Sequence, residues 1–377
     1  MTKSIFHNVK ISGIKTVIPE NYIDIDDEIN FFDNNPKKLT RAKNMMGYGR
    51  RYLADKNTTV VDMAVDAAEK LLKEMNYDKS NIELLIFVNQ KPDYREPSDA
   101  CIAHGRLNLE KFCAATDILL GCSGYVYGLW NAMSLIASGA VKNCLLLAGD
   151  IASYGIPQNN RKSAQLFGDA ASATLLEYTD EDMPSFFVMG TDGKGWDKII
   201  APFGGIRLPL NKEAFDLKVE DVNNNCWSCS QPMMKGEDVF KFSIEVAPEI
   251  IKNTLELANK EQNDVDIFAI HQANKQIVET IASKAGLPPE KAPWETFTKY
   301  ANNSTNSVAT VICDRLQGKK PKNVVMCAFG IGLSWGSCLV DLSKTYNGGI
   351  STYIASKTHL PRQEQINYWI KYFKGEI

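Results

Sequence analysis

Cys122 is the residue of this sequence best placed to act as a nucleophile. It stands in the stretch 119–141, LLGCSGYVYGLWNAMSLIASGAV, between Gly121 and Ser123-Gly124, where an amphipathic pattern begins. The pattern predicts a helix that starts beside Cys122, and the unpaired N–H groups of a first helical turn favour a nearby negative charge. We therefore expect the pKa of the thiol to be lowered toward the nucleophilic thiolate. A packing role is the alternative, because many buried cysteines only fill space.

His271 is the histidine best placed to assist such a thiol, which needs a proton partner and donors for a developing oxyanion. It ends an apolar run, VDIFAIHQ, and precedes a helical pattern. Junctions of this kind carry functional groups in α/β proteins. The other histidines are less favourably placed, since His7 and His359 lie in terminal segments and His104 lies on an expected helix. A capping or core histidine is the alternative for His271.

Two later stretches could supply donors to a substrate. Residues 299–310, KYANNSTNSVAT, gather amides and hydroxyls before a helical pattern, where they could bind a ligand or only cap the helix. Residues 328–342, AFGIGLSWGSCLVDL, carry glycines that would let backbone N–H groups approach a ligand. Their spacing is not that of a dinucleotide-binding fingerprint.

The elements that must position these residues alternate between buried strands and amphipathic helices, which predicts an α/β protein. The segments AAEKLLKEMNYDKSNIELLIFVNQ and IIKNTLELANKEQNDVDIFAIHQAN can be laid over each other, which indicates an internal duplication. An acidic stretch with a proline at 177–185 is a plausible linker. The expected strands are 83–90, 143–150, 265–272 and 323–330, and the expected helices include 60–76, 246–259 and 273–286.

Composition narrows the function classes. The chain has 377 residues, 44% of them hydrophobic, which is enough for a large core and two domain-sized units. The net charge of −3 without a run of like charges argues against nucleic acid as a partner. No apolar run is long enough for a membrane span or a signal peptide, so we expect a cytoplasmic protein with nine free cysteines.

Four stretches, GCSGYVYGL, HQAN, YANNSTNSVA and AFGIGLSWGS, together resemble the thiolase-like condensing enzymes, most closely the β-ketoacyl-acyl carrier protein synthase III family. The resemblance runs from about residue 5 to residue 342. It implies an α/β fold of five layers, α-β-α-β-α, built from two duplicated halves, and a homodimer without a permanently bound cofactor or metal. Residues 1–180 would carry the cysteine, 181–343 the histidine and asparagine, and 344–377 an extension.

The resemblance also implies roles for individual residues. Cys122 accepts an acyl group from a thioester, and His271 with Asn302 binds a malonyl-type thioester while carbon dioxide leaves. Attack of the carbanion on acyl-Cys122 gives a 3-oxoacyl product, in fatty-acid or in specialised lipid or polyketide biosynthesis. The backbone N–H groups of Cys122 and Ile331 form the oxyanion hole. Asn302 is preferred to Asn303 because it aligns with the family asparagine without a gap.

Acyl-CoA and acyl carrier protein are the substrates that the resemblance implies. The family uses a Trp and an Arg to hold the adenine of coenzyme A, but Arg41 and Met45 stand at those positions here, and the basic residue after HQAN is shifted. The residues expected to bind substrates are Arg161, which matches a second adenine-contacting arginine, together with Asn274, Lys275, Gly330 and Gly332.

Glu96 stands where the family places an apolar residue that reaches across the dimer into the partner's acyl pocket. A carboxylate there is similar to the branch of the family that joins two longer acyl chains, in which it acts as a general base. Non-decarboxylative condensation with Glu96 as base is therefore one alternative function. A solvated glutamate beside Arg95 is the other possibility.

Other readings remain open. An acyltransferase could use Cys122 with a hydroxyl or amine acceptor, whereas a non-catalytic subunit or a papain-like hydrolase fits the motifs poorly. The pair Cys226 and Cys229 has metal or redox spacing but lacks a second ligand pair. The helical pattern at the C-terminus, with Ile366 and Trp369, is expected to cap its own subunit rather than bind a partner.

Overall fold

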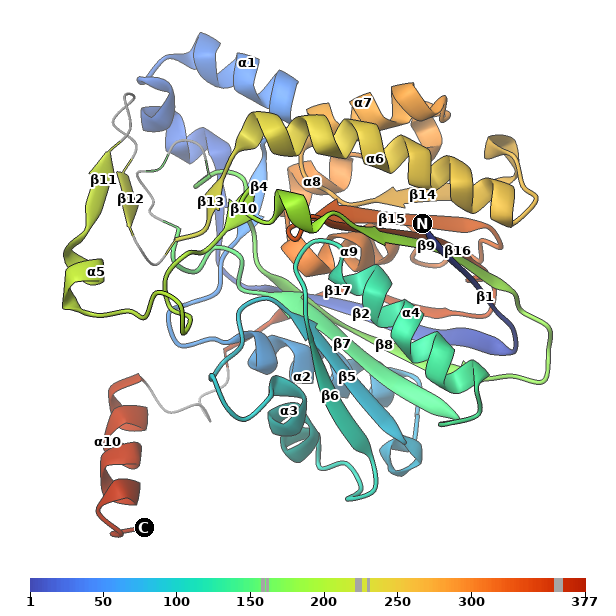
Figure 1. Cartoon of the computed structure of the whole chain (residues 1–377), viewed down its shortest axis with the longest axis horizontal. Helices are drawn as coiled ribbons and strands as arrows, with labels where there is room; N and C mark the ends of the chain where they lie inside the picture. Colours follow the sequence, from blue (N-terminus) through green and yellow to red (C-terminus); the bar gives the residue numbers. More distant parts are fainter. Residues whose placement is uncertain (157–159, 161–162, 221–225, 229–230, 356–361) are drawn as a thin grey trace.

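The computed structural model describes residues 1–156, 160, 163–220, 226–228, 231–355 and 362–377. Two mixed β-sheets dominate the fold, and helices lie on both outer faces and between the sheets (Figure 1). The six-stranded sheet has the order β17 (Tyr346–Tyr353), β2 (Val9–Pro19), β8 (Ala170–Tyr178), β7 (Asn143–Asp150), β5 (Leu84–Asn89) and β6 (Ala114–Leu119). The five-stranded sheet has the order β1 (Thr2–Phe6), β9 (Ser185–Thr191), β16 (Ser334–Val340), β15 (Val324–Gly330) and β14 (Ile267–Ile270).

The helices complete the five layers. Between the sheets, α4 (Gly124–Ala137) and α9 (Ser307–Arg315) form the central layer, and their apolar side chains join both sheets in one core. The outer face of the six-stranded sheet is covered by α2 (Val60–Glu74) and α3 (Asp99–Leu107), and that of the five-stranded sheet by α6 (Gly236–Leu257) and α7 (Lys275–Ala285). The five-layer α/β fold expected from the sequence is confirmed.

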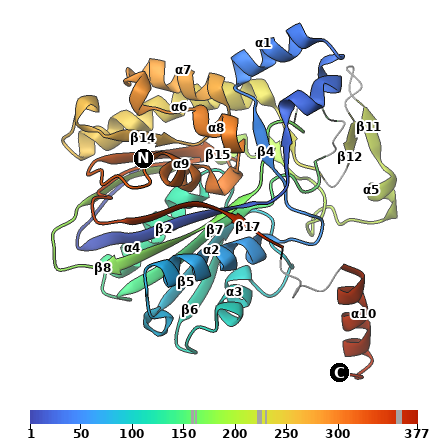
Figure 2. The same ribbon diagram turned by 180° about the vertical axis from the view of Figure 1, so that it is seen from behind.

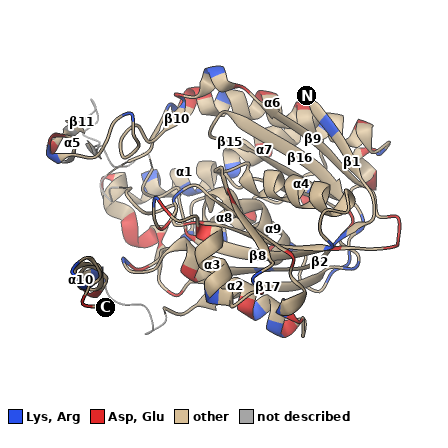
Figure 3. Ribbon diagram, turned by 60° about the horizontal axis from the view of Figure 1, so that its bottom comes forward, with Lys and Arg blue, Asp and Glu red and all other residues tan. Residues whose placement is uncertain are grey.

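Smaller elements surround this framework. They are α1 (Pro36–Met46), α5 (Lys212–Asp216), α8 (Glu295–Tyr300), α10 (Arg362–Phe373), the short strands β3 (Tyr22–Asp24), β4 (Arg50–Tyr52), β10 (Ile199–Ile200), β11 (Lys218–Glu220), β12 (Cys226–Ser228) and β13 (Met233–Met234), and several short 3₁₀ turns. Basic and acidic residues are mixed over these elements and the main helices (Figure 3). No helix in the described ranges is long and apolar enough to cross a membrane.

The two halves repeat the same arrangement. In the first half β5 pairs in parallel with β7, which pairs antiparallel with β8, and in the second half β14, β15 and β16 pair in the same way. The helix, 3₁₀ turn and strand formed by α2 and β5 recur as α6 and β14. Strands β5, β7, β14 and β15 are buried along their whole length because helices cover both faces of each sheet, which explains their continuous apolar runs.

Both ends of the chain cross from one half to the other. The first strand, β1, pairs with β9 in the second half's sheet, whereas β17 pairs in parallel with β2 in the first half's sheet (Figure 2). The stretch expected as a linker, 177–185, leads from β8 in one sheet to β9 in the other. The boundaries at residues 180 and 343 stay predictions.

The C-terminal helix α10 stands apart from the rest of the molecule (Figures 1 and 3). None of its residues is buried in the described part of the chain, and Trp369 and Phe373 are 41% and 85% exposed. A hydrogen bond of 2.8 Å from the Arg362 guanidinium to the carbonyl of Lys56 links its first turn to the body. The expectation that this helix caps its own subunit is wrong, because its apolar face makes no core contact.

Candidate active site

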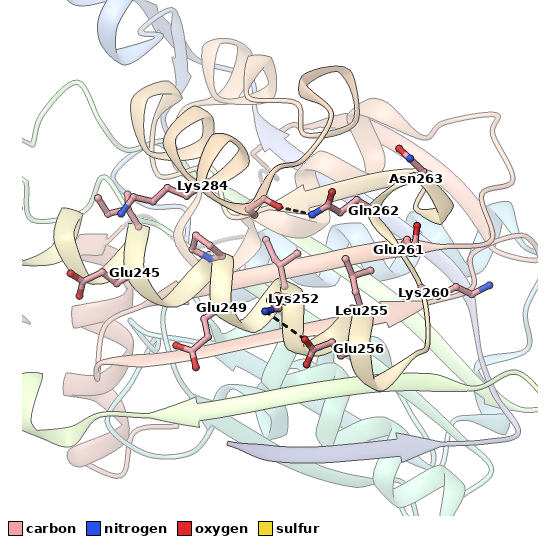
Figure 4. A pocket seen from close by; sticks show the side chains of 14 residues that line it. Glu245, Glu249, Lys252, Leu255, Glu256, Lys260, Glu261, Gln262, Asn263 and Lys284 are labelled. Carbon is pink, nitrogen blue, oxygen red and sulfur yellow. Dashed lines mark hydrogen bonds and ion pairs between the residues drawn. The ribbon is translucent and has the colours of Figure 1, made fainter.

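One cavity brings together residues from both halves of the fold. It measures about 470 Å³, and Cys122, His271 and Asn302 all line it, as do Gly330 and Ile331. Apolar side chains from α6, β13 and α7 form much of the remaining wall, among them Met234, Val239, Phe240 and Ile277. A larger hollow of about 830 Å³ lies on the outer surface along α6 and contains none of these catalytic candidates (Figure 4).

Cys122 lies in a tight turn between β6 and α4. The turn is closed by a hydrogen bond of 2.7 Å from the Gly124 N–H to the carbonyl of Gly121, and α4 begins at Gly124. Gly330, at the end of β15, packs directly on the cysteine, because a β-carbon at Gly330 would lie 2.7 Å from Cβ and 3.0 Å from Sγ of Cys122. The predicted position beside a helix start is confirmed, and only glycine fits opposite the thiol.

The expected lowering of the Cys122 pKa is wrong. Burial raises the pKa of the thiol from 9.0 to about 11, and the negative charge of Asp150 adds to the increase. Hydrogen bonds from the Ser304 hydroxyl and from the backbone N–H groups of Cys122 and Ile331 act in the opposite direction but are outweighed. The sequence pattern showed the helix start but not the depth of burial, which disfavours an anion more strongly. The free thiol is therefore protonated at neutral pH.

His271 follows the last residue of β14 and is 2% exposed. Its backbone N–H donates to the carbonyl of Cys327 at 2.8 Å, which continues the β14–β15 ladder, and its ring meets the edge of Phe329 at 5.6 Å between centroids. Burial lowers the pKa of the imidazole from 6.5 to about 3, so the ring is neutral. Within the described ranges no group hydrogen-bonds to its buried Nδ1.

Asn302 is held through its side-chain oxygen, and no hydrogen bond from its amide nitrogen to another described residue is present. Its side-chain oxygen accepts hydrogen bonds from the Ser304 N–H at 2.9 Å and the Ser307 hydroxyl at 3.4 Å. Its backbone is fixed by Leu166 and Gly168, with bonds of 3.0 and 3.1 Å. A neutral imidazole and a primary amide in one cavity are two donors suited to a carbonyl oxygen that gains negative charge.

The neighbouring asparagine behaves differently. The Asn303 amide nitrogen donates to the carbonyl of Tyr300 at 3.0 Å, and Asn303 is not among the residues that line the cavity. The structure therefore gives Asn302 and Asn303 different environments, whereas the sequence could distinguish them only through the family resemblance.

The remaining substrate-binding candidates are distributed over several places. Asn274 lines the cavity, and its side-chain oxygen caps α7 by accepting from the Ile277 N–H at 2.9 Å. Lys275 lies outside the cavity, with its ammonium 4.3 Å from the ring centroid of Trp294. Gly332, at φ +137°, follows the lining residue Ile331.

Several predicted positions lie away from the cavity or outside the described residues. Arg41 and Met45 are exposed on one side of α1, and Met45 and Lys275 both line a surface hollow between α1 and α7. Arg161 and Cys229 lie outside the described residues, and the side chain of Cys226 is also outside the description. The seven cysteines for which the structure describes a side chain are free thiols.

Glu96 does not contribute to the site of its own chain. It is exposed in the loop between β5 and α3 and does not line the cavity. The adjacent Arg95 donates a hydrogen bond of 3.2 Å to the carbonyl of Gly204.

Polar residues at the ends of β5 and β7 were not singled out from the sequence. Gln90, Lys91 and Asp150 line the cavity, and buried Asp150 accepts hydrogen bonds from the Gln90 N–H at 2.9 Å and the Thr305 hydroxyl at 2.6 Å. The sequence does show polar residues at the ends of both apolar strands, in the runs VNQK and AGD. Strand ends at the same sheet edge as the nucleophile could have identified these residues as part of the site.

Two parts of the chain match one protein family. Residues 116–193 match the family described as 3-Oxoacyl-[acyl-carrier-protein (ACP)] synthase III, and residues 255–342 match its C-terminal part. A putative 3-oxoacyl-[acyl-carrier-protein] synthase 3 from Campylobacter jejuni is 38% identical over 360 residues, which cover 94% of this chain and 100% of the relative. The chain belongs to the 3-oxoacyl-[acyl-carrier-protein] synthase III family.

Other synthase III proteins support this assignment. A β-ketoacyl-[acyl-carrier-protein] synthase III from Clostridium perfringens is 32% identical over 340 residues, 89% of this chain and 99% of the relative. The crystal structure of a 3-oxoacyl-(acyl-carrier protein) synthase from Burkholderia xenovorans LB400 superposes with a TM-score of 0.85 at 33% identity, over 93% of this chain and 99% of that one. The predicted family is confirmed, and the protein is an acyl-transferring condensing enzyme of the synthase III type.

Proposed function

We propose that Cys122 accepts an acyl group from a thioester and that His271 and Asn302 bind the thioester that supplies the attacking carbon. The observation that carries this proposal is the shared cavity of the three residues, one from the first half of the fold and two from the second. The product is a 3-oxoacyl thioester on an acyl carrier protein, the carrier that the names of the relatives contain.

The first step transfers the acyl group to the thiol. The Cys122 sulfur bonds to the thioester carbonyl carbon, the carbon–sulfur bond of the donor breaks, and the thiol proton ends on the departing sulfur. Backbone N–H groups of Cys122 and Ile331, which already point at the sulfur, stabilise the oxyanion. A pKa of about 3 makes His271 a weak resting base, so we assign it the role of donor.

The second step forms the carbon–carbon bond. His271 and Asn302 donate hydrogen bonds to the carbonyl oxygen of a malonyl-type thioester, which stabilises the enolate formed as carbon dioxide leaves. The enolate carbon attacks the acyl-Cys122 carbonyl, and the thiolate that leaves is protonated again. Neutral donors suit this step because they bind the enolate without moving a full proton to it.

A homodimer and a carrier-bound substrate complete the proposal. Among the described strands β6 lies at the edge of the six-stranded sheet, and its last residue, Leu119, and the nearby Phe112 are 68% and 98% exposed, so a second copy could extend the sheet. We propose acyl-CoA or acyl-carrier protein as donors, with Arg161, Asn274, Lys275, Gly330 and Gly332 as substrate-binding residues. No cofactor is required by these steps, and we propose the cytoplasm as the location.

A second candidate function uses Glu96. Glu96 is exposed and does not line the cavity of its own chain, so a partner's site could take up this carboxylate in the proposed dimer. There it would remove a proton from the α-carbon of a second acyl thioester. This proton transfer, instead of the loss of carbon dioxide, would form the enolate. Substitution Glu96→Gln should then abolish condensation of two acyl chains and leave acylation of Cys122 intact. Unchanged condensation would remove Glu96 as a base.

Adjacent asparagines provide a matched test of the main proposal. Enzyme acylated in advance is mixed with malonyl-acyl carrier protein, and release of carbon dioxide is followed for Asn302→Ala and Asn303→Ala. Loss of one oxyanion donor costs about 10²- to 10³-fold in rate, so we expect that loss for Asn302→Ala and less than about tenfold for Asn303→Ala. Equal rates for the two variants would contradict the role of Asn302.

A further inference from the structure

Lys91 is a partly buried cation in the cavity for which the mechanism above has no role. It follows β5 by two residues, and its ammonium donates to the backbone carbonyls of Ile151 at 3.3 Å, Ala152 at 3.1 Å and Tyr154 at 2.8 Å. An ammonium has three protons, so these three carbonyls use its full donor capacity.

The segment that Lys91 binds forms part of the cavity wall. Residues 151–156 follow β7 without forming a regular helix or strand, and Ala152, Tyr154 and Ile156 line the cavity. Carbonyl groups in such a turn need donors from elsewhere when water is excluded. The shape of this part of the wall therefore depends on the lysine.

A buried carboxylate, that of Asp169, binds other groups of the same segment. Asp169 accepts hydrogen bonds from the Ser153 N–H at 2.8 Å, the Ser153 hydroxyl at 2.7 Å and the Ala54 N–H at 2.8 Å. The lysine thus holds the carbonyl groups of the segment while the aspartate holds its N–H and hydroxyl groups. Such a pair of interactions fixes a loop more firmly than either one alone.

Lys91 lines the same cavity as the nucleophile Cys122. The preceding residue, Gln90, packs on the turn that holds Cys122, because a β-carbon at Gly121 would lie 2.6 Å from the Gln90 side-chain oxygen. Burial lowers the pKa of Lys91, and attraction to Asp150 and Asp169 opposes this effect. Because Asp150 also raises the pKa of Cys122, a cation close to Asp150 reduces the cost of forming the thiolate.

We propose that Lys91 is a positioning and specificity-determining residue, which sets the cavity wall at 151–156 and thereby selects the acyl groups that reach Cys122. The inference rests on the proposed acylation of Cys122. The proposed role of Lys91 is additional to the two catalytic steps, neither of which requires this residue.

The test compares Lys91→Met, which keeps the length of the side chain without donors, with Lys91→Arg, which keeps a charged donor. Lys319→Met, an exposed lysine outside the cavity, is the matched control. Acylation rates are measured by intact-protein mass spectrometry with short, medium and long acyl thioesters. We expect Lys91→Met to change the ratio of rates between donors by about tenfold or more, with partial recovery in Lys91→Arg and no change in the control.

A second readout does not depend on acylation. The rate at which iodoacetamide alkylates Cys122 is followed against pH, with Tyr48, Asp150, Tyr154 and His271 as the other titratable groups that line the cavity. We expect the profile of Lys91→Met to move to higher pH. Unchanged donor ratios and an unchanged alkylation profile would overturn the inference. Absence of acylation in the unmodified enzyme would instead contradict the proposed function, and the alkylation profile would then decide on Lys91.

Discussion

The two halves of the fold place different kinds of side chain at the carboxyl ends of corresponding strands. Asn89 ends β5 and His271 follows β14, although the repeat places these two residues one position out of step. The Asn89 amide donates to the Asp99 carboxylate at 2.7 Å, whereas Nδ1 of His271 has no partner in the described part of the chain. The Asn89–Asp99 hydrogen bond stabilises the fold, whereas the His271 ring lines the cavity, where a substrate could reach it.

The helices of the central layer show the same contrast. Cys122 lies just before α4 in the first half, and Asn302 lies before α9 in the second, with no hydrogen bond from its amide nitrogen to another described residue. The nucleophile thus comes from one copy of the repeat and both proposed donors from the other. The cavity that holds these residues therefore lies between the two halves.

The largest expected effect is on His271. Replacement His271→Ala should lower the rate of carbon dioxide release by about 10³-fold while acylation of Cys122 falls by less than about tenfold, because the imidazole is proposed to act on the second thioester. Single-turnover experiments with separate detection of acyl-enzyme and carbon dioxide measure both steps. Equal loss in both steps would show that His271 is needed for acyl transfer as well.

The acid sensitivity of the fold should also depend on His271. Burial lowers the pKa of this imidazole from 6.5 to about 3, so between these values the unfolded chain binds a proton that the folded chain does not. The stability that depends on the neutral ring is fully present above pH 6.5, and it is lost as the pH falls toward about 3. Urea unfolding of the unmodified protein and of His271→Leu at about pH 7 and about pH 5 should show a smaller loss in the variant. A loss of equal size would contradict a buried neutral histidine.

Asn89, at the carboxyl end of β5 in the first half, should affect stability rather than chemistry. Substitution Asn89→Ala leaves the buried Asp99 carboxylate with one donor fewer and should cost about 1–3 kcal/mol in the free energy of unfolding. Acylation of Cys122 should change little, because Asn89 does not line the cavity. Denaturant unfolding combined with the acylation assay tests this, and a rate loss without a stability loss would break the contrast between the halves.

The smallest expected effect is on α10. No described residue of this helix is buried, so removal of residues 362–377 should change the Tm by less than about 2 °C. Thermal unfolding of the shortened chain at several protein concentrations measures this directly. A large fall in Tm would show that the helix packs on a surface that the single chain does not contain.

Much of the fold was predictable from the sequence because local patterns determine it. The runs 143–150 and 323–330 read as buried strands and form β7 and β15, and the alignment of the duplicated segments predicted the repeat. The exchange of β1 and β17 between the halves was not predictable, because short strands carry no signal of their partner.

The candidate site was predictable in its residue types but not in its environment. The turn around Cys122 and the junction at His271 are visible as sequence, whereas the pKa of the thiol depends on burial by residues far apart in the chain, which reversed the expected direction. Lys91 was missed for the same reason, since its three acceptors are backbone carbonyls 60 or more residues away.

Intact-protein mass spectrometry after incubation with a panel of acyl thioesters, on coenzyme A and on acyl carrier protein, tests the central claim most directly. The unmodified enzyme and Cys101→Ala, which replaces an exposed free thiol, should gain the mass of one acyl group, and Cys122→Ala should gain none. Acylation that persists in Cys122→Ala, or no adduct with any donor in the unmodified enzyme, would contradict Cys122 as the acyl acceptor.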